Sequence, residues 1–111
     1  MAGALLHVVL VTFHDEASPD QRERLKRDMA GLGAACGGAT SGILHWQADW
    51  NLDRRKGYDL MSAGVFASAE CFAAYRADRA HRDFTARMSA VADWIVGDLP
   101  WTMAPPPQDE A

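Results

Sequence analysis

The chain has little cysteine, no excess of basic residues and no long apolar run. Its two cysteines, Cys36 and Cys71, lack the spacing of a zinc site, and we expect both to be reduced apolar fillers. The formal net charge of −4 argues against a nucleic-acid surface, which depends on clustered lysine and arginine. The longest apolar stretch, ALLHVVLVTF, is too short to span a bilayer and lacks the features of a secretory signal. We therefore expect a cytoplasmic protein that contacts no membrane.

The sequence also lacks the short motifs of common cofactor and hydrolase sites. There is no G-x-G-x-x-G, no P-loop and no G-x-S-x-G, so nothing supports a nucleotide site or a nucleophilic serine. Four histidines are present, and no two have the spacing that places local metal ligands on one face. We predict neither a metal nor a cofactor.

What is present is the composition of one globular domain. The chain has 111 residues, of which 49% are hydrophobic and 23% are charged, and this excludes disordered and collagen-like classes. The end of the chain is rich in proline. We expect a single domain over residues 1–103 and a flexible tail over residues 104–111.

Hydrophobic periodicity and capping residues indicate alternating strands and helices. Residues 5–13 are apolar on both faces, which is typical of a strand covered on both sides. Ser18, Pro19 and Gln21 have the layout of a capping box and begin a helix that ends near residue 35. We predict further strands over residues 42–50, 58–67 and 94–99. In the second strand, Ile43 shares a face with His45. Helical segments are expected from Ser68 onward and over residues 81–92.

This order of elements, β-α-β-β-α-β, places the chain in the α+β class. It predicts a ferredoxin-like protomer, in which a four-stranded antiparallel sheet carries helices on one face, with the second helix broken or extended into two pieces. The helices cover one face only, yet residues 5–13 are apolar on both. A second copy of the chain covers the other face most simply, so we predict a homodimer with the form of a dimeric α/β barrel.

One imidazole in the apolar first strand suggests a pocket. His7 needs either a hydrogen-bond partner in the core or access to a cavity. In the second case it points with Val9 and Val11 into space under the helices. Ser62 and Gly64, both small and two residues apart, leave volume on one face of the sheet. The four tryptophans either line such a pocket or fill the core and the dimer seam.

The stretch AAYRADRAHRDF, residues 73–84, holds the candidate acid/base pair Tyr75 and His81. On one unbroken helix, residues six apart point about 120° away from each other, so the two side chains do not meet. Spacing alone favours this arrangement, with Asp78 paired to Arg82 and His81 exposed, because no proline or glycine interrupts the stretch. A break near Asp78 and Arg79 would instead bring a base beside a hydroxyl donor.

Four short motifs together resemble the stress-responsive dimeric α/β-barrel (Dabb) proteins over roughly residues 5–101. These motifs are His7-Val8-Val9-Leu10, Lys56-Gly57-Tyr58-Asp59, Phe66-Ala67-Ser68 and Tyr75-x5-His81-x2-Phe84. The resemblance implies a ferredoxin-like protomer whose sheet packs against that of its twin.

One plant member of that family is a polyketide cyclase that performs an intramolecular aldol condensation. The tyrosine and final histidine of its pattern Tyr-x-x-His-Pro-x-His fall here on Tyr75 and His81. By similarity, His81 takes the α-proton while Tyr75 hydrogen-bonds the enolate or orients the imidazole. The chain departs from the pattern at Asp78 and Arg79, which replace its middle histidine and its proline. Asp78 lies three residues before His81, and a carboxylate there favours a charged imidazole that is a poor base.

The resemblance also outlines a binding pocket for a small hydrophobic or aromatic molecule. A first-strand histidine and a last-strand aspartate of the cyclase fall on His7 and Asp98, and a third-strand histidine is replaced by Leu60. The expected substrate-binding residues are His7, Val9, Val11, Leu60, Ser62, Phe84, Val96 and Asp98.

The function favoured is therefore that of a homodimer with an apolar pocket for a small molecule, and a cyclase-like aldol condensation by His81 and Tyr75 is the hypothesis for its chemistry. The alternatives are a non-catalytic stress-responsive or ligand-binding dimer and a cofactor-free oxygenase. An open cavity lined by His7, Tyr75 and His81 favours an enzyme or a binding protein, whereas a cavity plugged by Trp94, Phe84 or Met88 favours a structural role.

Overall fold

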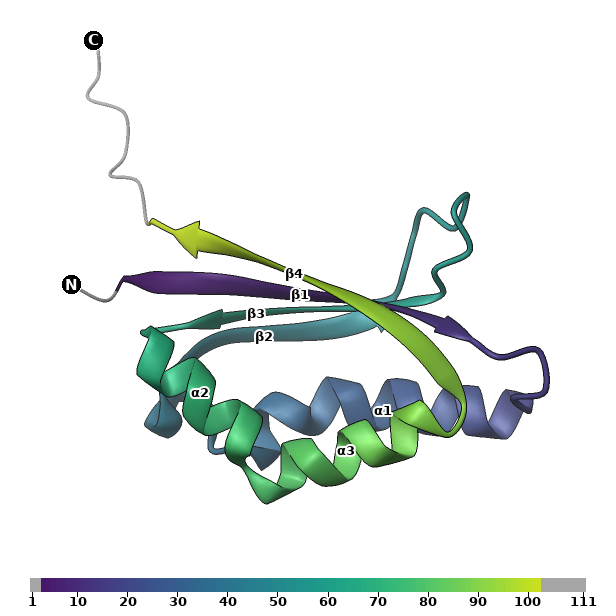
Figure 1. Ribbon diagram of the computed structural model, residues 1–111, viewed down its shortest axis with the longest axis horizontal. Helices are drawn as coiled ribbons and strands as arrows, with labels where there is room; N and C mark the ends of the chain where they lie inside the picture. Colours follow the sequence, from purple (N-terminus) through teal and green to yellow (C-terminus); the bar gives the residue numbers. More distant parts are fainter. Residues whose placement is uncertain (1–2, 103–111) are drawn as a thin grey trace, which may run out of the picture.

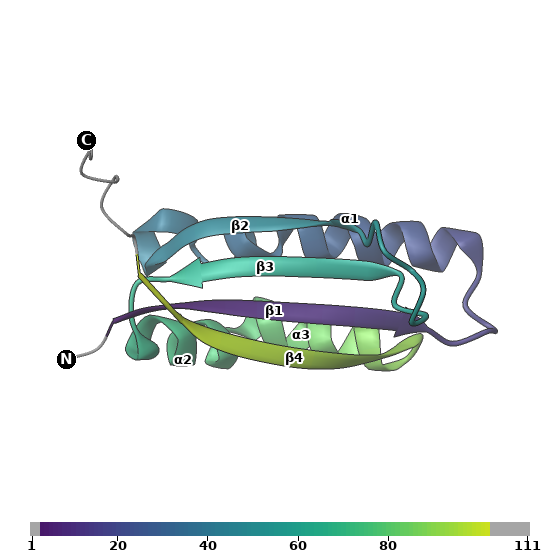
Figure 2. The ribbon, with the colours of Figure 1, turned by 90° about the horizontal axis from the view of Figure 1, so that it is seen from above.

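The protein forms one antiparallel sheet covered by helices, as seen in a computed structural model that describes residues 3–102. The tail predicted over residues 104–111 lies outside the described residues. In chain order the elements are β1 (Ala4–Phe13), α1 (Pro19–Ala35), η1 (Gly38–Ser41), β2 (Ile43–Trp50), β3 (Leu60–Phe66), α2 (Ala69–Ala77), α3 (Arg79–Ser89) and β4 (Ala92–Trp101). The sheet order is β2-β3-β1-β4, with every neighbouring pair antiparallel (Figure 2). This is the ferredoxin-like arrangement that the sequence predicts.

The helices lie on one face of the sheet (Figure 1). In the view from above, α1 runs behind β2 and β3, while α2 and α3 run behind β1 and β4 (Figure 2). The predicted capping box begins α1: Ser18 Oγ accepts a hydrogen bond from the Gln21 N–H, and Gln21 Oε1 accepts one from the Ser18 N–H. No helix in the described part of the chain is both long and apolar enough to cross a membrane.

Two strands differ from their predicted form. The register of β2 shifts between Ile43 and His45, so Ile43 is buried toward the helices and Leu44 bulges outward with 59% of its surface exposed. Ile43 therefore does not share a face with His45, and that prediction was wrong. Strand β4 is longer than residues 94–99 because it pairs with β1 along the whole length from Ala4 to Phe13.

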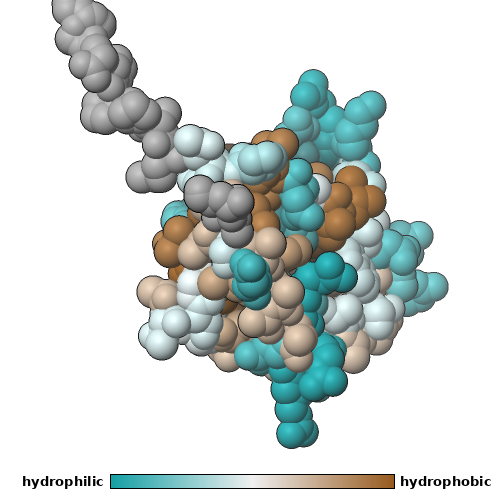
Figure 3. Space-filling view, turned by 60° about the vertical axis from the view of Figure 1, so that its left-hand side comes forward, coloured by the Kyte–Doolittle hydropathy of each residue, from teal (hydrophilic) through white to brown (hydrophobic). Residues whose placement is uncertain are grey.

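Within residues 3–102, no helix covers the opposite face of the sheet (Figure 1). In Figure 3 apolar residues gather toward the upper side of the molecule, where this face lies. Its exposed members on β4 include Ile95 (50%) and Leu99 (61%). The strand register places further apolar side chains on the same face: Leu6, Val8, Leu10, Met61 and Ala63. We call this surface the open sheet face. A surface of this kind is typical of a protein–protein interface.

Trp46 is held between the helix layer and the sheet at two glycines. A Cβ atom at Gly33 of α1 would lie 2.5 Å from Trp46 Cγ, and one at Gly64 of β3 would lie 2.7 Å from its Cε3. The indole Nε1 also donates a hydrogen bond of 2.9 Å to the carbonyl of Met29. The two glycines therefore allow a large aromatic ring to occupy a fixed position beneath the sheet.

Candidate functional site

The segment between Tyr75 and His81 is broken, not continuous. Asp78 has an extended backbone (φ −63°, ψ 139°), which ends α2 at Ala77 and begins α3 at Arg79. Its carboxylate caps α3 by accepting a hydrogen bond of 2.8 Å from the Ala80 N–H. The unbroken helix that spacing favours, with His81 exposed, is therefore wrong. The stretch needs no proline to end α2, because the Asp78 side chain can satisfy a backbone N–H at the start of a new helix.

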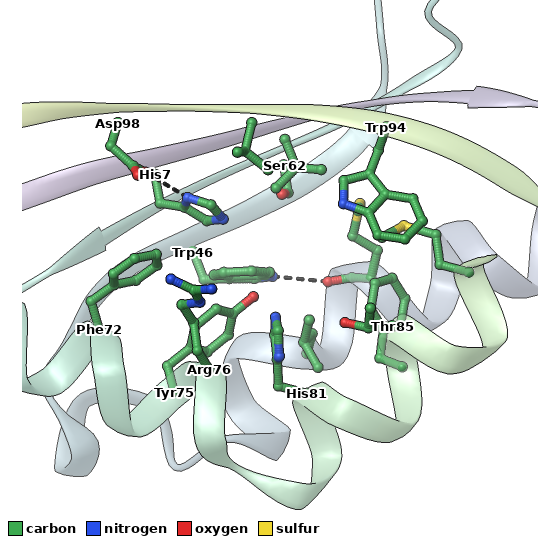
Figure 4. A pocket seen from close by; sticks show the side chains of 16 residues that line it. His7, Trp46, Ser62, Phe72, Tyr75, Arg76, His81, Thr85, Trp94 and Asp98 are labelled. Atoms are coloured by element: carbon green, nitrogen blue, oxygen red, sulfur yellow. Dashed lines mark hydrogen bonds and ion pairs between the residues drawn. The ribbon is translucent and has the colours of Figure 1, made fainter.

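The break closes one side of a cavity between the sheet and the helices. Its volume is about 340 Å³. Its polar lining comes from both layers, with His7, Ser62 and Asp98 on the strands and Tyr75, Arg76, His81 and Thr85 on the helices (Figure 4). The lining residues that remain exposed belong to α2 and β4, so the mouth lies between these elements. The space is large enough for a small organic molecule.

Tyr75 and His81 meet on the helix side of this cavity. Their ring centroids are 4.5 Å apart, and Figure 4 shows the tyrosine hydroxyl and the far end of the imidazole both turned into the cavity. The Nδ1 atom of His81 is buried and has no hydrogen-bond partner among the described residues. Leaving such a group without a well-aligned partner costs about 1–3 kcal/mol.

Burial determines the protonation of both groups. It lowers the pKa of His81 below the ordinary value, and the neighbouring His7 and Arg76 act in the same direction. The Arg76 carbonyl and the Asp78 carboxylate oppose this lowering but do not reverse it. Burial also raises the pKa of Tyr75. These shifts favour a neutral imidazole beside a protonated phenol at neutral pH, and the effect of the Asp78 carboxylate is smaller than that of burial.

His7 and Asp98 face each other from β1 and β4, which pair directly at these two residues. The Nδ1 atom of His7 lies 2.6 Å from Oδ1 of Asp98, and the Asp98 side chain is 48% exposed at the mouth of the cavity. The carboxylate accepts a hydrogen bond from Nδ1–H and so orients the ring, whose other nitrogen faces the cavity (Figure 4). Within residues 3–102 no three histidine, cysteine or acidic side chains come together as a metal cluster.

The structure brings most of the residues named from the sequence into one place. The cavity is lined by His7, Val9, Ser62, Tyr75, His81, Phe84, Val96 and Asp98. Val11 and Leu60 lie elsewhere: they pair across β1 and β3 and have no exposed surface, because the core under the sheet is filled at that point. Trp94, Phe84 and Met88 form walls of the cavity and do not plug it.

Several lining residues were missed by sequence reasoning, whereas Trp46 had been named as a possible lining residue and Met88 as a possible plug. Phe72 and Arg76 lie one turn apart on α2, and Thr85 and Met88 follow His81 at helical spacing on α3. Met29, Leu32 and Trp46 add the wall next to α1 and β2. Thr85 lies four residues after His81 on α3, and Arg76 lies four residues after Phe72 on α2. This helical spacing could have predicted that Arg76 and Thr85 line the cavity, but only after the break at Asp78 had been recognised.

Removal of the Asp78 cap is expected to loosen the start of α3. Asp78→Ala should lower the free energy of unfolding by about 1 kcal/mol, because the Ala80 N–H loses its acceptor. Urea unfolding at one fixed protein concentration measures this change. Asp78→Asn is the matched control, since asparagine caps equally well. Equal stabilities of Asp78→Ala and the wild type would contradict this role of the carboxylate.

Comparison with known families gives one match over most of the chain. Residues 5–100 match the Stress responsive A/B Barrel Domain family. No curated protein matches the chain.

Solved structures with the same fold include proteins from bacteria and plants. A dimeric ferredoxin-like protein of unknown function from Thermobifida fusca is 18% identical, with a TM-score of 0.77 over 91% of this chain and 93% of that one. An Arabidopsis thaliana protein is 25% identical, with a TM-score of 0.73 over 91% of this chain and 98% of that one. A hydroxynitrile lyase from Passiflora edulis is 16% identical, with a TM-score of 0.75 over 96% of this chain and 100% of that one.

Proposed function

Because the chain belongs to the stress-responsive A/B barrel domain family, we propose that it is a homodimer whose protomers each act on a small apolar or aromatic molecule held between sheet and helices. The proposed reaction is a polyketide cyclase-like aldol condensation, with His81 as the base and Tyr75 as the hydrogen-bond donor. The observation that carries this proposal is the meeting of these two side chains on one cavity, 4.5 Å between ring centroids, across a broken helix.

The protonation of the pair suits the proposed chemistry. In an aldol condensation a base removes a proton from the carbon next to a carbonyl, and the carbonyl oxygen gains negative charge. The lowered pKa of His81 keeps its imidazole neutral and able to accept that proton. The raised pKa of Tyr75 keeps its hydroxyl protonated and able to donate to the enolate oxygen. The new carbon–carbon bond then forms when the enolate carbon attacks a second carbonyl of the same chain, and the imidazolium returns its proton to the resulting alkoxide. Loss of this hydroxyl with a remaining α-proton, as water, completes the condensation.

The walls of the cavity support an apolar ligand. Aromatic and aliphatic side chains make up the surface between the polar groups: Val9, Met29, Leu32, Trp46, Phe72 and Trp94. Such walls hold a flexible molecule in one folded pose, and this positioning brings two of its carbons together for reaction. A hydroxynitrile lyase with this fold supports the view that the scaffold is compatible with catalysis.

The homodimer is supported by the open sheet face and by relatives. The Thermobifida fusca protein is dimeric and has the same protomer fold. Pairing two open sheet faces would bury the apolar side chains of β1, β3 and β4 in both copies at once. The cavities lie on the helix side of each sheet, opposite the open sheet face.

A bulky residue at the mouth is expected to block binding. Val96→Trp should weaken the affinity for aromatic ligands at least about tenfold, since Val96 lines the mouth and is 58% exposed. Calorimetric titration of the full-length protein with small aromatic and β-dicarbonyl compounds measures the change. Val96→Ala, which opens the mouth, should retain binding.

The same titration separates an enzyme from a binding protein. Compounds that bind the wild type but are never converted favour the non-catalytic alternative. Binding that is unchanged by Val96→Trp would remove the cavity from consideration as the ligand site.

A further inference from the structure

One charged residue at the cavity has no carboxylate partner among the described residues. Arg76 lies in the last turn of α2 and lines the cavity mouth. Its guanidinium stacks over the Phe72 ring at 5.7 Å, on the side of the cavity where Phe72 and Tyr75 stand (Figure 4). Three other arginines, Arg55, Arg79 and Arg87, each pair with an aspartate. Within residues 3–102 no carboxylate pairs with Arg76.

Two carboxylates close to Arg76 in the cavity lining or in the chain accept hydrogen bonds from other groups. Asp98, the only carboxylate among the described residues that line the cavity, accepts a hydrogen bond from His7 at 2.6 Å. Asp78, two residues further along the chain, caps α3 through Ala80. The guanidinium is therefore the strongest unused hydrogen-bond donor at the mouth, and it lies above walls that are mostly apolar.

We propose that Arg76 binds the carboxylate of a ligand whose apolar body fills the cavity, so that the ligand, whether substrate or product, is a small aryl or acyl monocarboxylate. This inference rests on the proposed function of the cavity as a ligand site and narrows its chemistry. A guanidinium presents parallel N–H groups that match the two oxygens of a planar carboxylate. A phosphate dianion needs more positive charge, and among the lining residues Arg76 is the one arginine or lysine.

The size and layout of the cavity agree with this class. A volume of about 340 Å³ corresponds to roughly eleven water molecules at about 30 Å³ each, which is the scale of one substituted aromatic ring or a short acyl chain. With the carboxylate at Arg76, next to Tyr75 in the chain, the body of the ligand extends inward past Tyr75 and His81. The solvent-facing end of the ligand is then the charged one, which avoids burying a charge.

The test compares acids with their neutral amides on the full-length protein. Benzoate and 3-phenylpropanoate are titrated against benzamide and 3-phenylpropanamide, with binding followed by calorimetry or by the fluorescence of Trp46 and Trp94 in the cavity wall. The acids should bind the wild type about ten to a hundred times more tightly. Arg76→Gln should abolish this preference while the affinity for the amides stays the same, and Arg76→Lys should retain part of it.

Arg79→Gln is the matched control. Arg79 is also exposed on the same helical pair, but it pairs with Asp83 and does not line the cavity, so its loss should leave the preference for acids intact. The role of Arg76 is overturned if the wild type binds acids and amides equally, or if the preference for acids survives in Arg76→Gln. Either result still supports the cavity as a ligand site. If neither acids nor amides bind the wild type, the ligand-site proposal fails as well.

Discussion

Replacing His81 by alanine is expected to slow α-proton abstraction by about a hundredfold to ten-thousandfold, the usual contribution of a positioned general base. The natural substrate is not needed to measure this. The full-length protein is incubated in heavy water with an enolisable β-keto thioester or β-diketone, and exchange of the α-proton for deuterium is followed by NMR. Tyr75→Phe should slow the exchange by about a hundredfold, because it removes one donor to the enolate oxygen.

The pH dependence provides a second readout of His81. The base is the neutral imidazole, so the exchange rate should rise as pH increases through the lowered pKa of His81 and then level off. The inflection lies below the ordinary value of 6.5 because burial disfavours the charged ring. Since burial also raises the pKa of Tyr75, the plateau should extend past the pH at which an ordinary tyrosine ionises.

His14 offers the matched control for this experiment. It lies in the turn after β1, pairs with Asp93 at 3.3 Å and does not line the cavity. His14→Ala should therefore keep the rate and the inflection. Full exchange activity in both His81→Ala and Tyr75→Phe would rule out the acid/base pair, and the cavity would then be one for binding alone.

A charge placed on the open sheet face is expected to break the dimer. Val8 lies in the middle of β1 and points away from the helices, between Ala63 on β3 and Gly97 on β4. In a twofold-symmetric dimer, Val8→Asp places two carboxylates in the interface without partners. An unpaired buried charge costs about 3–5 kcal/mol, so the dissociation constant should rise by at least about a hundredfold. Sedimentation velocity across a range of micromolar concentrations measures the change.

The control for this variant adds the same charge on the helix side. Ala86 is exposed on α3, on the covered face of the sheet, so Ala86→Asp should remain as dimeric as the wild type. A wild-type protein that is a lone protomer at micromolar concentration would contradict the proposal outright. So would a Val8→Asp variant that stays fully dimeric, because the open sheet face would then not be the interface.

The sequence predicted the architecture because local patterns specify local structure. Apolar residues on both faces of residues 5–13 predicted a strand, and β1 forms over Ala4–Phe13. The Ser18-Pro19-Gln21 pattern predicted the start of α1, and the structure has that capping box. The chain also matches its predicted family over residues 5–100. Each of these signals spans a few neighbouring residues, which is the range over which periodicity and capping act.

The bulge in β2 and the position of Leu60 were decided by packing. Alternation along one strand cannot show that Ile43 turns inward while Leu44 bulges out, since the shift depends on how β2 meets β3. Likewise Val11 and Leu60 share the face of His7, yet they are sealed in the core while His7 borders the cavity. Which part of a sheet face stays hollow depends on which side chains the helices bring to it.

For the candidate site, the sequence by itself determined which residues were available: a histidine in an apolar strand, small residues at Ser62 and Gly64, and Tyr75 six residues before His81. Only the tertiary structure decided that α2 ends at Ala77, that Tyr75 and His81 meet, and that Arg76 faces the same cavity. The physical reason is that an aspartate permits a helix to stop and restart but does not require it. Packing of α2 and α3 against the sheet selects the broken form, and the side chains that do the packing come from strands far away in the chain.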